Sequence, residues 1–124
     1  MIKKIETLYP VSIWLGYCTT EEEYESIFHD GDWKKTIEEY SSSDGLTVYC
    51  DHRLLIHYNE YFEFGTIMHE CYHGANNIWN CIGAKHDTDN DEPFAYLLSF
   101  LTEESRKFLA ERFSPEMGKD INNS

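Results

Sequence analysis

The sequence predicts an α+β domain in which a small β-sheet packs on two long helices. Short runs rich in β-branched and aromatic residues occupy the first half of the chain. From Phe62 onward, apolar residues instead recur every three or four positions, which is the period of a helix. The 124 residues, 41% of them hydrophobic, suit one domain, 1–124, with one core.

Three strands and a short helix are expected before residue 60. YPVSIWLGYC (9–18) is typical of a buried strand, and LTVYC (46–50) and RLLIHYN (53–59) of two neighbouring strands. TTEEEYESIFHD (19–30) predicts a helix, with a threonine as its cap and glutamates in the first turn. HDGDW (29–33) and SSSDG (41–45) are turn signals.

Two long helices follow. The first carries an apolar stripe and stops at Gly83, and the polar segment 84–91 then predicts a loop. Pro93 opens the second helix, which runs from about Asp91 to about Arg112. PFAYLLSFL is apolar nearly all round, so we expect its first half to be buried and its amphipathic second half to be more exposed. The stripe of the first helix consists of Ile67, Met68, Cys71, Tyr72, Ala75, Ile78, Trp79 and Ile82.

The charge balance disfavours several functions. The net charge is −13 with only 10 lysines and arginines, which disfavours binding of nucleic acid through a basic patch. No apolar run has the roughly 18 residues of a membrane span, and no signal peptide is recognisable, so a cytoplasmic protein is expected. An acidic surface that imitates nucleic acid and blocks a basic partner is an alternative function. Without CxxC spacing, the four cysteines are expected to be buried thiols.

The motif HECYH, residues 69–73, predicts a metal site. Residues four apart on a helix lie about 40° apart around the axis and about 6 Å apart along it, so His69 and His73 can reach one ion. Glu70 points about 100° away from His69 and can act on a water near the metal. This division of labour, with two histidine ligands and a glutamate as general base, is that of the HExxH pattern.

A catalytic zinc site needs a third protein ligand. The candidates after the motif are His86, Asp87, Asp89, Asp91 and Glu92. Glu92 is favoured because it begins a buried helix that can pack on the HECYH helix and hold the side chain rigidly. Tyr96, Asp91, Asn76 and Asn77 are candidates for orienting the histidines. Candidates for stabilising the oxyanion are Arg53, His57, Tyr58, Tyr61 and His86.

The stretch IMHECYHGANNIW…NDEPFAYLLSFL resembles the gluzincins, zinc metallopeptidases with an HExxH helix and a glutamate ligand on a later helix. Eighteen residues separate His73 from Glu92, which is similar to the aminopeptidase-type members. It also looks like small zincin-like proteins encoded by bacteriophages. The resemblance implies a minimal zincin-like domain, zinc on His69, His73 and Glu92, Glu70 as the base, and location in the host-cell cytoplasm.

Zinc-dependent hydrolysis of a peptide or protein substrate is therefore the expected function. The strand RLLIHYN is a candidate to line the cleft and pair with an extended peptide. A zinc-stabilised protein that is catalytically weak and binds a partner is a second alternative, beside the acidic inhibitor. The sequence leaves the oligomeric state open.

Overall fold

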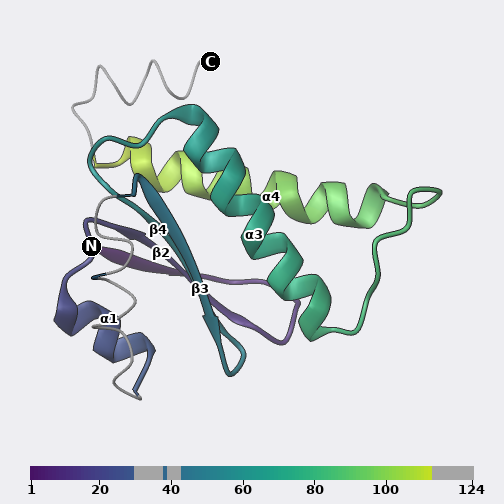
Figure 1. The fold of residues 1–124 in the computed structure, drawn as a ribbon, viewed down its shortest axis with the longest axis horizontal. Coiled ribbons are helices and arrows are strands. Elements are labelled where there is room, and N and C mark those ends of the chain that lie inside the picture. The colour runs from purple at the N-terminus through teal and green to yellow at the C-terminus, as the bar shows by residue number, and fades with distance from the viewer. Residues whose placement is uncertain (30–37, 39–42, 113–124) are drawn as a thin grey trace.

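A four-stranded mixed sheet forms the centre of the fold. The computed structural model describes residues 1–29, 38 and 43–112. Within them the chain forms β1 (Ile2–Ile5), β2 (Ser12–Tyr17), α1 (Glu21–Ile27), β3 (Gly45–Cys50), β4 (Arg53–Tyr58), α3 (Phe64–Cys81) and α4 (Glu92–Ala110). The strand order is β1-β2-β4-β3 (Figure 1). The predicted α+β class is confirmed.

The central strands β2 and β4 pair in parallel, from Ser12 with Arg53 to Tyr17 with Tyr58. β1 pairs with β2, and β3 with β4, in antiparallel fashion. The predicted adjacency of 46–50 and 53–59 is confirmed. Asp51 and His52 join these two strands with φ angles of 50° and 62°, and such a pair of positive φ angles is typical of a tight hairpin loop. The strand order places β3 at one edge of the sheet, whereas β4 lies between β2 and β3.

The two faces of the sheet bury different helices. On β2 and β4, alternate side chains such as Ile13, Leu15, Leu54 and Ile56 pack with α3 and α4. The intervening Leu55 packs instead with α1, beside Trp14 of β2 and Val48 of β3. Figure 1 shows α3 and α4 crossing on one side of the sheet, away from α1. This period-2 alternation gives three layers: α1, the sheet, and the pair α3 and α4.

A glycine lets α3 approach the sheet closely. A Cβ atom added at Gly74 would lie 2.8 Å from Cδ1 of Ile56 on β4. That distance is well inside van der Waals contact, so a side chain at this position would push the helix away from the strand or force Ile56 to move. Gly74 therefore sets the spacing between α3 and β4.

The local signals near the helix ends are confirmed. Thr20 caps α1, and its hydroxyl accepts a hydrogen bond from the Glu23 backbone N–H at 3.2 Å. Gly83, with a φ of 75°, follows the end of α3. Pro93 lies in the first turn of α4. Residues 30–33 of the predicted turn 29–33 and residues 41 and 42 of the predicted turn 41–45 lie outside the described residues.

Two predictions are corrected. β1 was not expected, because IKKI is short and half of it is lysine. The first half of α4 is the more exposed half: Tyr96 is 72% exposed, whereas Phe108 and Leu109 are fully buried. α4 packs against β2 as well as α3, and its N-terminal half extends away from the strands (Figure 1). The hydrophobic pattern of a helix does not predict which of its halves will lie over the sheet.

The cysteine prediction holds in part. All four cysteines lie in the described part of the chain, and none forms a disulfide. Cys71 is buried and Cys81 is half-buried, but Cys18 and Cys50 are exposed, which corrects the expectation of buried thiols. None of the helices in residues 1–29 and 43–112 has the length and apolar character needed to cross a membrane.

Candidate metal centre

The HECYH motif lies near the middle of α3, as the helical period predicts. The backbone N–H of Glu63 donates to Oγ1 of Thr66 at 3.1 Å, which satisfies a donor at the start of this helix. The buried face of α3 consists of Ile67, Glu70, Cys71, Gly74, Ala75 and Ile78. The stripe is thus narrower than expected, because Met68, Tyr72 and Ile82 are each 39–46% exposed.

His69 and His73 point toward the same place. Their Nε2 atoms are 3.1 Å apart and the two rings are nearly perpendicular, with an interplanar angle of 77°. Two nitrogens bound to one tetrahedral zinc ion at about 2.0–2.1 Å lie about 3.3–3.4 Å apart. The separation also suits an N–H···N hydrogen bond in which one ring donates. The Nε2–Nε2 distance is therefore within a few tenths of an ångström of the distance in a shared zinc site.

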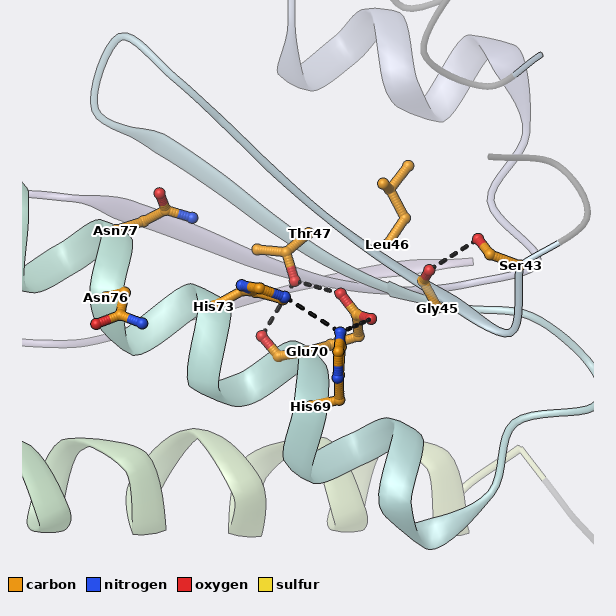
Figure 2. A pocket seen from close by; sticks show the side chains of 9 residues that line it. All are labelled: Ser43, Gly45, Leu46, Thr47, His69, Glu70, His73, Asn76 and Asn77. Atoms are coloured by element: carbon orange, nitrogen blue, oxygen red, sulfur yellow. Dashed lines mark hydrogen bonds and ion pairs between the residues drawn. The ribbon is translucent and has the colours of Figure 1, made fainter. Parts of the chain in front are cut away.

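Glu70 lies on the buried side of the same turn and is only 8% exposed. Oγ1 of Thr47 on β3 lies 2.8 Å from Glu70 Oε1 and 3.0 Å from the Glu70 backbone carbonyl, and its hydroxyl can donate to either oxygen. The other carboxylate oxygen, Oε2, lies 4.0 Å from Nε2 of His69. The carboxylate is therefore fixed by a neighbouring strand beside the two imidazoles (Figure 2).

The three side chains face an open cavity of about 540 Å³ between β3 and α3 (Figure 2). Its lining residues come from the start of β3 and one side of α3: Ser43, Gly45, Leu46, Thr47, His69, Glu70, His73, Asn76 and Asn77. Gly45 makes room for the glutamate, since a Cβ there would lie 2.8 Å from Cγ of Glu70 and 2.8 Å from Cγ2 of Thr66. The edge strand therefore forms one wall of the cavity.

Glu92 is not brought to this cavity. It is the first residue of α4 and is exposed. α4 meets α3 through other positions, as in the ring contact of Phe94 with Tyr72 and the contact of Thr102 with Met68. Within residues 1–29 and 43–112, no three histidine, cysteine, aspartate or glutamate side chains are grouped so that they could hold a metal ion. Among the described residues, the histidine pair therefore has no third donor grouped with it.

The candidates for orienting the histidines are divided in the same way. Asn76 and Asn77 line the cavity, whereas Asp91 and Tyr96 do not. The amide oxygen of Asn76 contacts Nε2 of His86, which lies against Phe94 outside the cavity. Because Asn76 already contacts His86, Asn77 is the remaining predicted residue in the lining that could orient His73.

The candidates for the oxyanion lie elsewhere. None of Arg53, His57, Tyr58, Tyr61 and His86 lines the cavity. Tyr58 is buried and donates to Oγ of Ser105 at 3.0 Å, and burial raises its pKa. Cys71 lies 3.4 Å from both hydroxyl oxygens, so the three groups form a buried polar cluster between β4, α3 and α4. Tyr58 thus has a structural partner.

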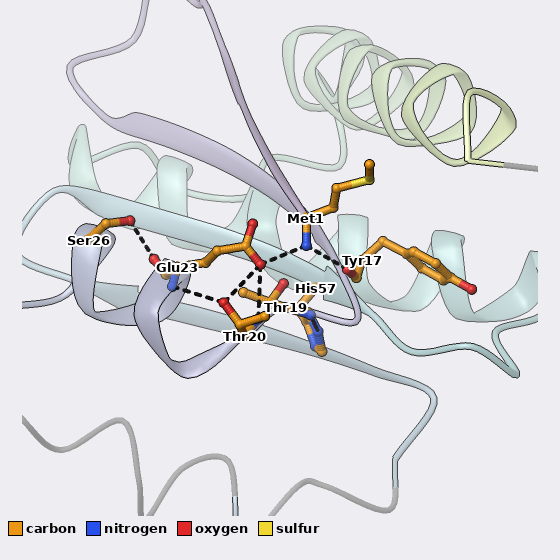
Figure 3. Close-up of polar contacts among 7 residues, drawn as sticks. All are labelled: Met1, Tyr17, Thr19, Thr20, Glu23, Ser26 and His57. Atoms are coloured by element: carbon orange, nitrogen blue, oxygen red, sulfur yellow. Dashed lines mark hydrogen bonds and ion pairs between the residues drawn. The ribbon is translucent and has the colours of Figure 1, made fainter.

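His57 also has a structural role (Figure 3). Its Nε2 accepts a hydrogen bond from the backbone N–H of Thr19 at 3.1 Å, on the sheet face that α1 covers. Burial and the nearby N-terminal ammonium lower the pKa of His57 to about 4, and the carboxylate of Glu23 opposes this. Glu23 is itself bound to the ammonium group of Met1 at 2.7 Å. His57 is therefore a neutral acceptor that joins β4 to the segment before α1.

Sequence reasoning missed Gly45 and Thr47, which lie 25 and 23 positions before Glu70. The only local signal is the period of the strand, which places both residues on the same face of β3. Their relation to Glu70 depends on β3 being paired to β4 at the sheet edge beside α3. Neither a protein-family model, nor a curated protein, nor a solved structure matches this chain.

Proposed function

We propose that this protein is a zinc-dependent hydrolase that cleaves peptide bonds, with the metal on His69 and His73 and with Glu70 as general base. The observation that carries the proposal is the 3.1 Å separation of the two Nε2 atoms, beside a buried carboxylate. Two imidazoles and a carboxylate in a minimal zincin-like domain are the groups that this chemistry requires.

In this proposal each residue has a distinct task. When bound, the metal supplies Lewis acidity, which polarises a carbonyl and makes water more acidic. Glu70 takes the proton of the attacking water and passes it to the nitrogen of the leaving amine. Thr47 keeps the carboxylate at the cavity floor, because its hydroxyl lies 2.8 Å from Oε1. A catalytic glutamate held in this way does not need to reorganise during the reaction.

The strand that pairs with the substrate is reassigned. The prediction for RLLIHYN is wrong, because β4 is paired on both sides, with β2 and with β3. β3 is the edge strand, and among the described residues no strand pairs with its outer side. Because Gly45, Leu46 and Thr47 line the cavity, an extended peptide added to β3 would pass the histidine pair.

The first experiment measures zinc content by elemental mass spectrometry after purification and zinc loading. We expect about one zinc ion per wild-type chain, and a loss of affinity of at least about tenfold in His69→Ala and His73→Ala. His52→Asn removes an exposed histidine outside the cavity with a residue that tolerates the positive φ of the hairpin, and it is expected to keep the metal. A wild-type protein that binds no zinc when it is supplied would contradict the proposal.

Glu92 stays a predicted third ligand, and Glu92→Ala tests it in the same assay. Loss of zinc would assign it as a ligand despite its position on α4. Retention of zinc would remove Glu92 from the ligand set and pass the role of third ligand to His86 or to an aspartate of segment 84–91. The second candidate function is a metal-binding protein without catalysis. The contact of His86 with Asn76, which lines the cavity, is the observation behind it, because a structural zinc site needs further protein ligands to close.

Glu70→Gln separates the two functions. The amide keeps the shape of the side chain and its contact with Thr47, but it cannot take a proton. We expect zinc binding to persist and cleavage of a mixture of unstructured peptides, followed by mass spectrometry, to fall by about 100-fold or more. Equal cleavage by wild type and variant would remove Glu70 from the mechanism.

A further inference from the structure

A second cavity lies beside α3 and shares no lining residue with the cavity at the histidine pair. It has a volume of about 230 Å³ and is formed by α3, the segment between the long helices, and the first turn of α4. Three aromatic side chains line it: Tyr72 and Trp79 of α3, and Phe94 of α4. Pockets for drug-sized ligands have volumes of roughly 300–1,000 Å³, so this cavity suits a single side chain or a small ion.

The rings of this cavity are fixed against one another. Phe94 lies 5.7 Å from Tyr72 and 5.7 Å from Trp79, at interplanar angles of 76° and 77°. His86 contacts the same ring at 4.5 Å. The indole N–H of Trp79 donates to the backbone carbonyl of Lys85 at 3.3 Å, which ties the ring to the segment after α3. Rings held at nearly right angles present both faces and edges to one small space.

The other lining residues are polar, and two of them are acidic, Asp87 and Asp91; the rest are Lys85, His86, Thr88 and Asn90. Asp87 accepts a hydrogen bond from the Asp89 backbone N–H at 2.9 Å, which holds its side chain in the turn. Asp91 is the N-cap residue of α4, but its side chain makes no capping hydrogen bond. Lys85 also lines the cavity and offsets part of this negative charge. Aromatic faces and carboxylates in one pocket favour a cation.

We propose that this cavity binds the cationic end of a lysine or arginine side chain of a partner polypeptide. Aromatic rings attract a cation through their negative faces, and the two carboxylates add a direct charge interaction. The net charge of −13 steers basic partners toward this surface at long range. The cavity is separate from the one at the histidine pair, and the inference requires neither metal nor hydrolysis.

The test is a titration of the whole chain followed by two-dimensional ¹H–¹⁵N NMR. The ligand is a blocked tripeptide Gly-Lys-Gly, and its matched control carries norleucine, which has a similar apolar stem without the ammonium. We expect saturable shifts of the Trp79 indole N–H signal with the lysine peptide, at least about threefold weaker binding of the norleucine peptide, and no comparable shifts at His69 or His73. A Trp79→Phe variant assigns the indole signal.

The charge variants have a matched control within the same acidic segment. Asp91→Asn is expected to weaken binding by about threefold or more, whereas Asp89→Asn, which removes the same charge outside the lining, is expected to change it by less than about twofold. Lys85→Gln is expected to strengthen binding, because it removes a like charge. Phe94→Leu tests the rings and is expected to weaken binding about threefold or more.

Several results would overturn the proposal. One is the absence of saturable shifts, and another is equal binding of the norleucine peptide. A third is an equal loss in Asp89→Asn and Asp91→Asn, which would show attraction by the acidic surface as a whole. Tighter binding of choline than of the lysine peptide would replace the proposed occupant with a small quaternary amine. Because Asp91→Asn and Lys85→Gln change exposed positions, these tests do not depend on the folding of the Phe94 variant.

Discussion

The imidazole of His57 lies on the face of the sheet that α1 covers, and the residue is 9% exposed. Its bond to the Thr19 backbone N–H requires a neutral ring, since Nε2 must accept. An imidazolium there would lose this bond and would sit in a poorly solvated place. Unfolding therefore favours protonation of this residue.

The free energy of unfolding should fall in acid because of His57. The pKa of His57 is about 4 in the folded protein and 6.5 in the unfolded chain, where the ring is not buried. Between these two pH values the unfolded chain therefore binds more protons than the folded protein. The contribution is complete above about pH 6.5 and is lost as the pH falls toward 4, by about 3 kcal/mol in all, of which about 2 kcal/mol is lost between about pH 7 and pH 5. Urea unfolding at pH 7.0 and pH 5.0, monitored by circular dichroism, measures this loss.

A matched pair of variants isolates the residue. His57→Gln keeps an acceptor but does not titrate, so its stability should change less between the two pH values than that of the wild type. His29→Gln alters an exposed histidine that the proposed site does not use and should keep the wild-type dependence. If His57→Gln has the same pH dependence as the wild type, another group is responsible.

At the scale of elements, the spacing between β4 and α3 depends on Gly74. Gly74→Ala would place a methyl group 2.8 Å from Cδ1 of Ile56 in a fully packed layer. We expect a destabilisation of about 1–3 kcal/mol, although alanine is the better helix former. Gly65→Ala is the control in the same helix, because nothing lies within 4 Å of its added Cβ, and it should be neutral or stabilising by up to about 1 kcal/mol. Denaturant unfolding of both variants measures the difference, and equal values would contradict the packing argument.

The elements themselves were largely predictable, because each has a local cause. The period of three and four residues gave α3, Thr20 and the glutamates gave α1, and the alternation of apolar residues gave β2, β3 and β4. β1 was not predictable in this way, because its four residues pair with β2 without burying a continuous face. The wrong burial of α4 has a similar cause, since a helix can cross its neighbour at many angles for one hydrophobic pattern.

In the candidate site, too, local geometry was predictable from the sequence and contacts between distant segments were not. Two histidines four positions apart must lie on one side of a helix, so their proximity was a consequence of local geometry. The placement of Glu92 depends on the segment between α3 and α4 and on the crossing of the two helices, and neither is encoded in a short motif. Thr47 and Gly45 reach Glu70 only through the pairing of β3 with β4.

For the molecule as a whole, the two halves of the sheet differ in how far apart their partners lie in the sequence. β3 and β4 form a hairpin, with partners no more than 13 residues apart, as in Gly45 with Tyr58. Each parallel pair of β2 and β4 joins residues 41 positions apart, as in Ser12 with Arg53. The entropy cost of closing the longer loop is greater, and contacts between distant residues form late.

Folding should therefore begin with β3, β4 and α3, and β2 should join afterwards. Hydrogen-exchange labelling at short refolding times, read by mass spectrometry, is expected to show protection of 45–58 and 64–81 before 12–17. Earlier protection of 12–17 would contradict this order.

The parallel pairing has a consequence for a growing chain. Residues 12–17 leave the ribosome long before their partners in β4 have been made. Until then, Ile13 and Leu15, which are fully buried in the folded protein, can pair only with the short strand β1 and have neither β4 nor the helices α3 and α4 to pack against. β2 is thus the segment at which aggregation, or a chaperone that prevents it, would act first during synthesis.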